Sequence, residues 1–382
     1  MATSIATSPR LPDYKNGCIT GIIPALLGPQ GTKEIPDWMP SCVKGARQVV
    51  LLVIDGLGWH QLQKNIEHCP TLAAMQGSSI TTVAPTTTVS ALTSITTGLA
   101  PAEHGLVGYR IDMGARVMQM LKWGDEKGDL RNMYPPDLIQ PCPPFMGASV
   151  PVLSKAELEG SAFTEAHLRG VRARGWRAAS SIAVEVGQLL RSGEKFIYAY
   201  YDGIDKIAHE RGFGSFYEAE LASADAIVKK IQDALTPGAV LIVTADHGQV
   251  MVGTNTMPPH PEVMAMVAYQ SGEGRFRWLH ARDGVQVELL ARAIAHHVGH
   301  TTRQHLRGGG LAVDQPGTVH RKITVRSWLR NTRCSRWYLT ALDRATVSVS
   351  RPVATRSSGR YTWSTRCTSC SMIGPSSRSL VT

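Results

Sequence analysis

The sequence predicts an α/β protein in which helices cover both faces of a mostly parallel central sheet. Three apolar runs predict buried strands: residues 48–54 (QVVLLVI), 195–201 (KFIYAYY) and 239–244 (AVLIVT). Each run is short and continuous rather than alternating, which is typical of strands that are covered on both faces. Helical patterns lie between the runs, and this alternation of strands with helices indicates a layered fold.

Three segments have the spacing or composition of helices. Residues 215–235 place apolar side chains at positions 221, 224, 227, 228 and 231, which is a period of 3.6. Residues 154–170 and 179–190 are also expected to be helical. Stretches rich in Pro and Gly at 134–152 and 252–262 are expected to be surface loops.

The positive charge of the chain belongs to its last fifth. Residues 299–382 contain 14 Lys and Arg residues and two acids, Asp314 and Asp343, which is a net charge of +12. Because the whole chain carries +10, the first 298 residues sum to −2. The charge therefore gives no reason to expect that the main part of the chain binds nucleic acid.

The character of the sequence changes near residue 298. We expect a main domain over residues 1–298, with a cap or loop insertion at about 110–160, and a basic tail over 299–382. The tail has no sustained period, contains no Glu and holds three of the eight Trp residues. A nucleic-acid-binding arm and a solvated, disordered tail are two interpretations. We favour a third, that the segment is translated out of frame, because Trp is unusual in disordered arms.

The cysteines and the apolar runs bear on location. Seven cysteines are scattered along the chain without a framework, which fits reduced thiols. The longest apolar runs are too short to span a bilayer. Near the N-terminus, Pro24 interrupts a modest apolar stretch and no small-residue cleavage site follows it. We therefore expect a cytoplasmic protein without a membrane segment.

Acidic and histidine side chains follow each of the three predicted strands. Asp55 follows the first, Asp205 and His209 come after the second, and Asp246 and His247 follow the third. Ligands of open α/β sheets bind at the carboxyl edge of the strands, and carboxylate oxygens with imidazole nitrogens suit zinc. The spacing of four puts Asp205 and His209 on one face of a helical turn. The alternatives are a turn or helix-cap residue for Asp55, and an ordinary Asp–His helix pair for Asp205 and His209.

The pair Asp246–His247 needs a further condition. Adjacent side chains at a strand end diverge, so both can bind one metal only if the chain turns at once. Gly248 follows them and is expected to allow that turn through its backbone freedom. The alternative is an ordinary capped strand end.

Three consecutive threonines, Thr86, Thr87 and Thr88, precede a helix-like segment at residues 89–97. A threonine at this place is usually an N-cap. A helix N-terminus also offers free N–H groups and the positive end of the dipole to a phosphate. A hydroxyl there, beside zinc, can ionise and attack phosphorus.

Five motifs occur in a fixed order along the chain. They are VIDG at 53–56, PTTT at 85–88 followed by Gly98, PAEHG at 101–105, DKIAH at 205–209 and ADHG at 245–248. In this order and spacing they resemble the alkaline phosphatase superfamily and, within it, the type I phosphodiesterase/nucleotide pyrophosphatase family. The resemblance covers about residues 45–250.

The resemblance implies an alkaline-phosphatase-like α/β/α fold over residues 1–298 and a site with two zinc ions. The implied activity is hydrolysis of phosphodiester or pyrophosphate bonds in a small, nucleotide-like substrate. Thr88, ten residues before Gly98, matches the nucleophile and would carry a phospho-threonine intermediate. One zinc would be bound by Asp55, Asp246, His247 and the Thr88 hydroxyl, and the other by Asp205, His209 and a third ligand.

Two departures from the family pattern affect these expectations. Tyr109 stands where the family has an Asn that contacts the phosphoryl oxygen, so a tyrosine hydroxyl would bind substrate instead. The third ligand of the second zinc should be a late His-Gly, and no His-Gly follows His247. We therefore expect an incomplete second zinc site and disrupted final strands. A phosphomonoesterase of the same superfamily, or a catalytically impaired relic, are the alternatives.

Overall fold

The computed structural model describes the side chains of most residues between 11 and 293. These residues are 11–28, 35–114, 116–253, 258–286, 288–289 and 292–293, and the backbone is also described for 352–357 and 360–365. The chain divides into two compact units. The first is Met1–Pro258 with Ser271–Arg277, and the second is Pro259–Gln270 with Trp278–Thr382.

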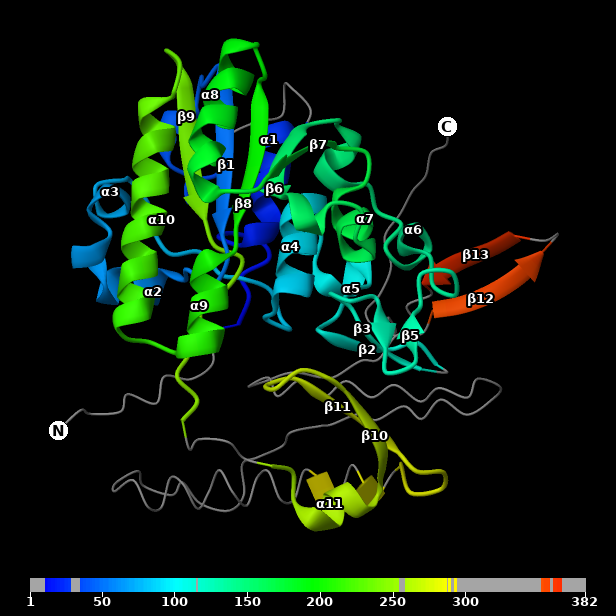
Figure 1. Cartoon of the computed structure of the whole chain (residues 1–382). Helices are drawn as coiled ribbons and strands as arrows, with labels where there is room; N and C mark the ends of the chain where they lie inside the picture. The colour runs from blue at the N-terminus through cyan, green and yellow to red at the C-terminus, as the bar shows by residue number, and fades with distance from the viewer. Residues whose placement is uncertain are drawn as a thin grey trace, which may run out of the picture. The chain divides into compact units, whose positions relative to one another are not determined.

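A five-stranded parallel sheet forms the centre of the first unit, with the strand order β7-β6-β8-β1-β9 (Figure 1). The strands are β1 (Gln48–Ile54), β6 (Pro151–Lys155), β7 (Arg172–Trp176), β8 (Phe196–Tyr201) and β9 (Ala239–Thr244). In register, Val53 of β1 lies between Tyr200 of β8 and Thr244 of β9. The predicted parallel sheet and its three apolar strands are confirmed.

Helices cover both faces of this sheet (Figure 1). Leu51 and Val53 of β1 pack in one core with α4 (Thr88–Thr97) and α7 (Ala162–Leu168). The alternate residues of β1 pack in a second core with α8 (Ile182–Arg191) and α10 (Ser215–Asp233). Because successive side chains of a strand point to opposite faces, one continuous apolar run supplies both cores.

The predicted helices agree with the structure in two places and differ in a third. Residues 179–190 and 215–235 correspond to α8 and α10. The helix predicted over 154–170 is wrong in its first part, because residues up to Lys155 belong to β6, which pairs with β7 and β8. A short 3-10 turn, Ala156–Leu158, follows, and only α7 is an α-helix. Pairing in the sheet therefore overrides the local helical pattern.

The remaining elements of the first unit are short. An antiparallel meander lies inside the stretch predicted as an insertion, and Gly272 pairs with its first strand at Arg110. Its strands are β2 (Arg110–Asp112), β3 (Val117–Gln119), β4 (Gly124–Asp125) and β5 (Gly128–Asp129). The short helices are α1 (Ile22–Leu27), α2 (Trp59–Lys64), α3 (Pro70–Ala73), α5 (Pro101–His104), α6 (Pro136–Ile139) and α9 (Gly203–Arg211).

The second unit includes α11 (Pro261–Ala265), most of β10 (Val267–Gly272) and most of β11 (Arg277–Ala281), with a small apolar cluster around Val263 and Val267. Within the predicted tail, only the backbone pair β12 (Pro352–Ser357) and β13 (Arg360–Thr365) is described. The rest of the tail, and the place where the family's final strands would be, lie outside the described residues. Among the described residues, no helix is long and apolar enough to cross a membrane.

Candidate active site

The predicted site residues follow three neighbouring strands at the carboxyl edge of the central sheet. Asp55 comes directly after β1, Asp205 lies in the first turn of α9 after β8, and Asp246 comes two residues after β9. Carboxyl ends of parallel strands meet at one edge, so residues far apart in the sequence are brought together there.

His247 is at the centre of this group. Its Nε2 atom lies 3.1 Å from Oγ1 of Thr88, 3.4 Å from Oδ1 of Asp55 and 3.5 Å from Oδ2 of Asp246. Its Nδ1 atom lies 3.1 Å from the carbonyl oxygen of Gly248, which can only accept a hydrogen bond. The tautomer with its proton on Nδ1 donates to this oxygen and turns the lone pair of Nε2 toward the other three side chains, as a metal ligand requires.

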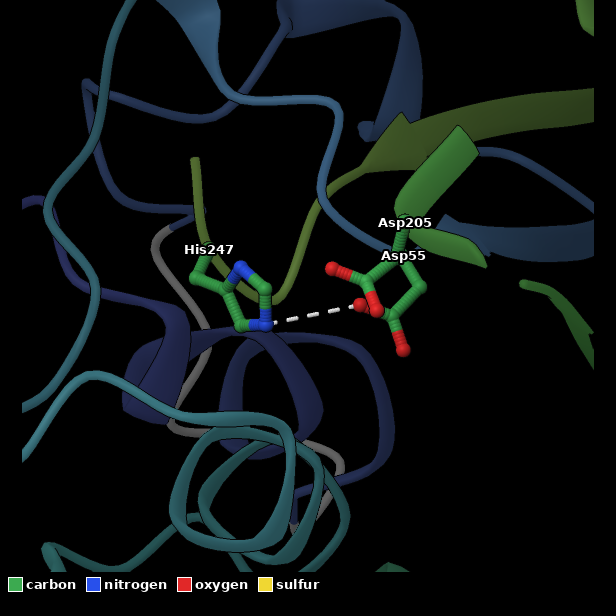
Figure 2. A group of neighbouring side chains, drawn as sticks. All are labelled: Asp55, Asp205 and His247. Atoms are coloured by element: carbon green, nitrogen blue, oxygen red, sulfur yellow. Dashed lines mark ion pairs between the residues drawn. The ribbon is translucent and has the colours of Figure 1, made fainter. Parts of the chain in front are cut away.

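A third carboxylate adjoins this group. Ligand atoms of Asp55, Asp205 and His247 all lie within 4.8 Å of one another (Figure 2). One turn further along α9, Nε2 of His209 lies 3.5 Å from Oδ1 of Asp205, as the spacing of four predicts. The His209 side chain is 76% exposed, so this end of the group is open to solvent.

The buried carboxylates suit a divalent cation. Asp55 and Asp246 are almost completely buried, and in the described part of the chain neither Oδ1 of Asp55 nor Oδ2 of Asp246 has a hydrogen-bond partner. Burial, and then the charges of Asp246 and Asp205, raise the pKa of Asp55 well above its ordinary value. A buried carboxylate without a counter-charge is costly. Carboxylate oxygens with an imidazole nitrogen are ligands that zinc accepts, so the residues present fit a metal ion.

The three threonines of the PTTT motif have different surroundings. The hydroxyl of Thr86 donates to the carbonyl oxygen of Val83 at 2.8 Å, and that of Thr87 is hydrogen-bonded to Glu273. Thr87 is the N-cap residue of α4, but its side chain makes no cap hydrogen bond, and Thr88 is the first helical residue. Of the three, Thr88 is the one whose hydroxyl contacts His247. Its role as nucleophile remains a prediction.

The turn at Gly248 does not use the left-handed region of the backbone, whereas Gly56 has a φ of +75°. Gly248 instead packs against Gly58, where an added Cβ would lie 2.5 Å from the Gly248 Cα. These glycines let the loops after β1 and β9 touch beside Asp246 and His247. The amide N–H groups of Gly56 and His247 both donate to Oδ1 of Asp246, at 3.1 and 2.8 Å.

His104, the histidine of the PAEHG motif, is buried and serves the scaffold. Its Nδ1 accepts from the Leu106 amide at 3.2 Å, so its Nε2–H faces the Ser94 hydroxyl of α4 at 2.9 Å. Burial lowers the pKa of His104 to about 4, so the ring is neutral. Tyr109 is half-buried, and within the described residues no hydrogen bond joins its hydroxyl to the carboxylate group. Its predicted role in substrate binding remains open to test.

Three residues of the site were missed at the sequence level. The hydroxyl of Tyr200 in β8 donates a hydrogen bond to Oδ2 of Asp55. Gln249 donates through Nε2 to Oδ1 of Asp205 at 2.8 Å, and Glu273 contacts Thr87, with burial raising the pKa of its carboxyl to about 7. Tyr200 lies inside an apolar run and resembles a core residue, and no local pattern distinguishes Gln249 or Glu273.

Comparison with known families decides the identity. The model of the family described as type I phosphodiesterase / nucleotide pyrophosphatase matches residues 49–307, about two thirds of the chain. The chain belongs to this family. Type I phosphodiesterases and nucleotide pyrophosphatases hydrolyse phosphoester bonds, so membership places the chain among phosphoric diester hydrolases. A search of curated proteins finds no match.

Several solved structures are similar to the chain. Murine ectonucleotide pyrophosphatase/phosphodiesterase 5 has 14% identity and a TM-score of 0.47, covering 64% of this chain and 69% of its own. An inactive variant of that murine protein in complex with AMP has 13% identity and a TM-score of 0.46, with the same coverage. Phosphonoacetate hydrolase from Sinorhizobium meliloti 1021 has 16% identity and a TM-score of 0.39, covering 53% of this chain and 57% of its own.

Proposed function

We propose that this protein is a zinc-dependent hydrolase of phosphodiester or pyrophosphate bonds in small, nucleotide-like substrates, with Thr88 as the nucleophile. The observation that carries the proposal is the convergence on Nε2 of His247. The Thr88 hydroxyl and a free oxygen of each of two buried carboxylates lie within 3.5 Å of this atom. A partly buried hydroxyl and imidazole next to two buried carboxylates suit metal-assisted attack on phosphorus.

The chain's own residues account for binding and attack. The N-terminus of α4 favours an anionic phosphoryl group next to Thr88, because the N–H groups of its first turn have no intrahelical acceptors. Oγ1 of Thr88 bonds to phosphorus and gives up its proton to solvent, while the bond from phosphorus to the leaving oxygen breaks. Water then cleaves the phospho-threonine and restores the hydroxyl. When bound, zinc lowers the pKa of the hydroxyl and neutralises charge on the phosphoryl oxygens.

The metal ligands divide into two proposed sets. Asp55, Asp246, His247 and Thr88 would hold one zinc in a buried position. Asp205 and His209 would hold a second at the open end, where Gln249 already contacts Asp205. With two protein ligands from α9, the second position is incomplete and would bind zinc more weakly. Tyr109 is the proposed donor to the substrate phosphoryl oxygen, and the cytoplasm is the proposed compartment.

The rates of hydrolysis of a phosphodiester, a pyrophosphate and a phosphomonoester test the proposal. We expect the zinc-loaded protein to hydrolyse bis(para-nitrophenyl) phosphate and a dinucleotide pyrophosphate faster than para-nitrophenyl phosphate. A preference for the monoester by orders of magnitude would establish the phosphomonoesterase instead. Absence of turnover for all three, in a protein that holds zinc and unfolds cooperatively, would identify a catalytically impaired relic.

A further inference from the structure

The two buried carboxylates of the site share a hydrogen-bonding pattern. Each has one oxygen that accepts hydrogen bonds and one buried oxygen that has no hydrogen-bond partner in the described part of the chain and lies only at ion-pair distance from His247. For Asp246, the accepting oxygen is Oδ1, and its donors are backbone amides. For Asp55, the accepting oxygen is Oδ2, and its side-chain donor is the hydroxyl of Tyr200. Both free oxygens face Nε2 of His247.

The sheet places Tyr200 where its hydroxyl reaches Asp55. Tyr200 of β8 is in register with Val53 of β1, and the Asp55 amide donates to the carbonyl oxygen of Tyr201 at 2.9 Å. Asp55 comes two residues after Val53, so its side chain leaves the same face of the sheet. A diagonal neighbour two residues along an adjacent strand is within reach of an aromatic side chain.

Tyr198 provides an internal comparison. It precedes Tyr200 by two residues on β8, points to the same face, and is also buried in the core beside α4. Its hydroxyl has no hydrogen-bond partner among the described residues. The two tyrosines therefore offer similar packing and differ in whether the hydroxyl holds a carboxylate.

We propose that Tyr200 is a positioning residue, whose hydroxyl fixes the rotation of the Asp55 carboxylate so that Oδ1 alone points to the metal. This inference rests on the proposed function, since it presupposes a metal at Asp55. Donors to a ligating carboxylate orient it, and removing such a partner typically lowers metal affinity about 10- to 100-fold. The Asp246 carboxylate is held by backbone amides, which a substitution cannot remove. The orientation of the Asp55 carboxylate depends on a side chain, and Tyr200→Phe removes that donor.

Zinc affinity of the purified protein tests the inference, with Tyr200→Phe compared with Tyr198→Phe. The readouts are competition against a chromophoric chelator and the visible absorption spectrum of the cobalt-substituted protein. We expect Tyr200→Phe to lower zinc affinity about 10- to 100-fold and to alter the cobalt spectrum. Tyr198→Phe should leave both close to the wild type. In the metal-free proteins Tyr200→Phe should be the less stable variant, because it leaves Oδ2 of Asp55 buried without its side-chain donor, whereas the Tyr198 hydroxyl has no hydrogen-bond partner to lose among the described residues. Zinc affinity is therefore compared under conditions in which both variants are folded.

The outcomes separate this inference from the proposed function. If the wild type binds neither zinc nor cobalt, the proposed function fails and this inference fails with it. If the wild type binds zinc and Tyr200→Phe has the same affinity and spectrum, only the role of Tyr200 is overturned. Equal weakening by both variants would also overturn it, because packing would then be the cause. If Tyr200→Phe does not fold, replacing Tyr200 with 4-aminophenylalanine keeps the ring and puts an N–H donor at the place of the hydroxyl. Affinity within about tenfold of the wild type would support the role of the donor, and a larger loss would contradict it.

Discussion

Oγ1 of Thr88 lies 3.1 Å from Nε2 of His247, although the two residues are 159 positions apart in the chain. The first residue of α4 and the loop after β9 thus meet above the carboxyl end of β1. Thr88 is the first residue of α4, and its hydroxyl contacts His247.

Replacing Thr88 with Ala should abolish turnover and leave the fold intact. The substitution removes the attacking oxygen, so kcat should fall on the order of 10³-fold or more. Zinc content should fall much less, since two carboxylates and His247 remain. Steady-state kinetics with bis(para-nitrophenyl) phosphate and metal analysis check both expectations.

Thr86→Ala is the matched control for Thr88→Ala. It lies in the same motif, and its hydroxyl bonds to the carbonyl oxygen of Val83 rather than to the carboxylate group. Loss of that single hydrogen bond, worth about 1 kcal/mol, should keep the rate within about tenfold of the wild type. Residual rates that are equal in Thr88→Ala and in the wild type would contradict the nucleophile and favour a relic.

The protein should retain one zinc ion tightly and a second weakly. The buried set contains Asp55, Asp246 and His247, whereas the second set depends on Asp205 and a His209 side chain that is 76% exposed. Fewer protein ligands and greater exposure weaken metal binding. Metal analysis after exhaustive dialysis should therefore give close to one zinc ion per chain. A second ion should bind when the dialysed protein is titrated with micromolar zinc. Two ions that survive dialysis equally would contradict the incomplete second site.

Much of the site was visible in the sequence because polar residues directly follow apolar runs. The apolar runs of β1, β8 and β9 alone predict that Asp55, Asp205 and Asp246 lie at one edge of the sheet. The edge strand β7 was not predicted, because four of its five residues are exposed and no apolar pattern marks it. Strand β6 was missed because its ends fall in two different predictions. Pro151 and Val152 belong to the stretch predicted as a surface loop, which is wrong there since both are buried, and Ser154 and Lys155 belong to the predicted helix.

The supporting residues could not be predicted for a different reason. The partnership of Tyr200 with Asp55 depends on the register of two strands whose residues are 145 positions apart. Likewise, Gly248 was explained by backbone freedom, whereas its contact with Gly58 is a close approach of two loops. Both relationships arise from tertiary packing, which the secondary-structure propensity of a short segment does not predict.

Gly58→Ala should damage the site through steric crowding alone. The φ and ψ of Gly58 are −65° and 158°, which alanine adopts without strain. The added Cβ would lie 2.5 Å from Cα of Gly248 and 2.6 Å from Oε1 of Gln61, so the loop after β9 must move. We expect a destabilisation of about 1–3 kcal/mol and a clear loss of zinc affinity. Denaturant unfolding and zinc competition provide the measurements.

Gly77→Ala is the control for this substitution, because a Cβ at Gly77 meets no atom within 4 Å. Its free energy of unfolding should stay within about 0.5 kcal/mol of the wild type, with unchanged zinc affinity. If Gly58→Ala bound zinc as tightly as Gly77→Ala, the contact between the two glycine loops would not be what positions Asp246 and His247.

The buried imidazole of His104 should make the fold sensitive to acid. Burial lowers its pKa to about 4 in the folded state, against an ordinary value of about 6.5 in the unfolded chain. Between these values the unfolded state binds more protons, so stability is fully present above pH 6.5 and is lost as the pH falls toward 4. The loss of folding free energy attributable to His104 is roughly 3 kcal/mol.

Denaturant unfolding at a series of pH values should therefore show a shallower decline of stability for His104→Gln than for the wild type. His60→Gln, on an exposed position of α2, should keep the wild-type slope. A His104 ring that titrates near 6.5 by NMR in the folded protein would contradict the expectation, even if His104→Gln does not fold.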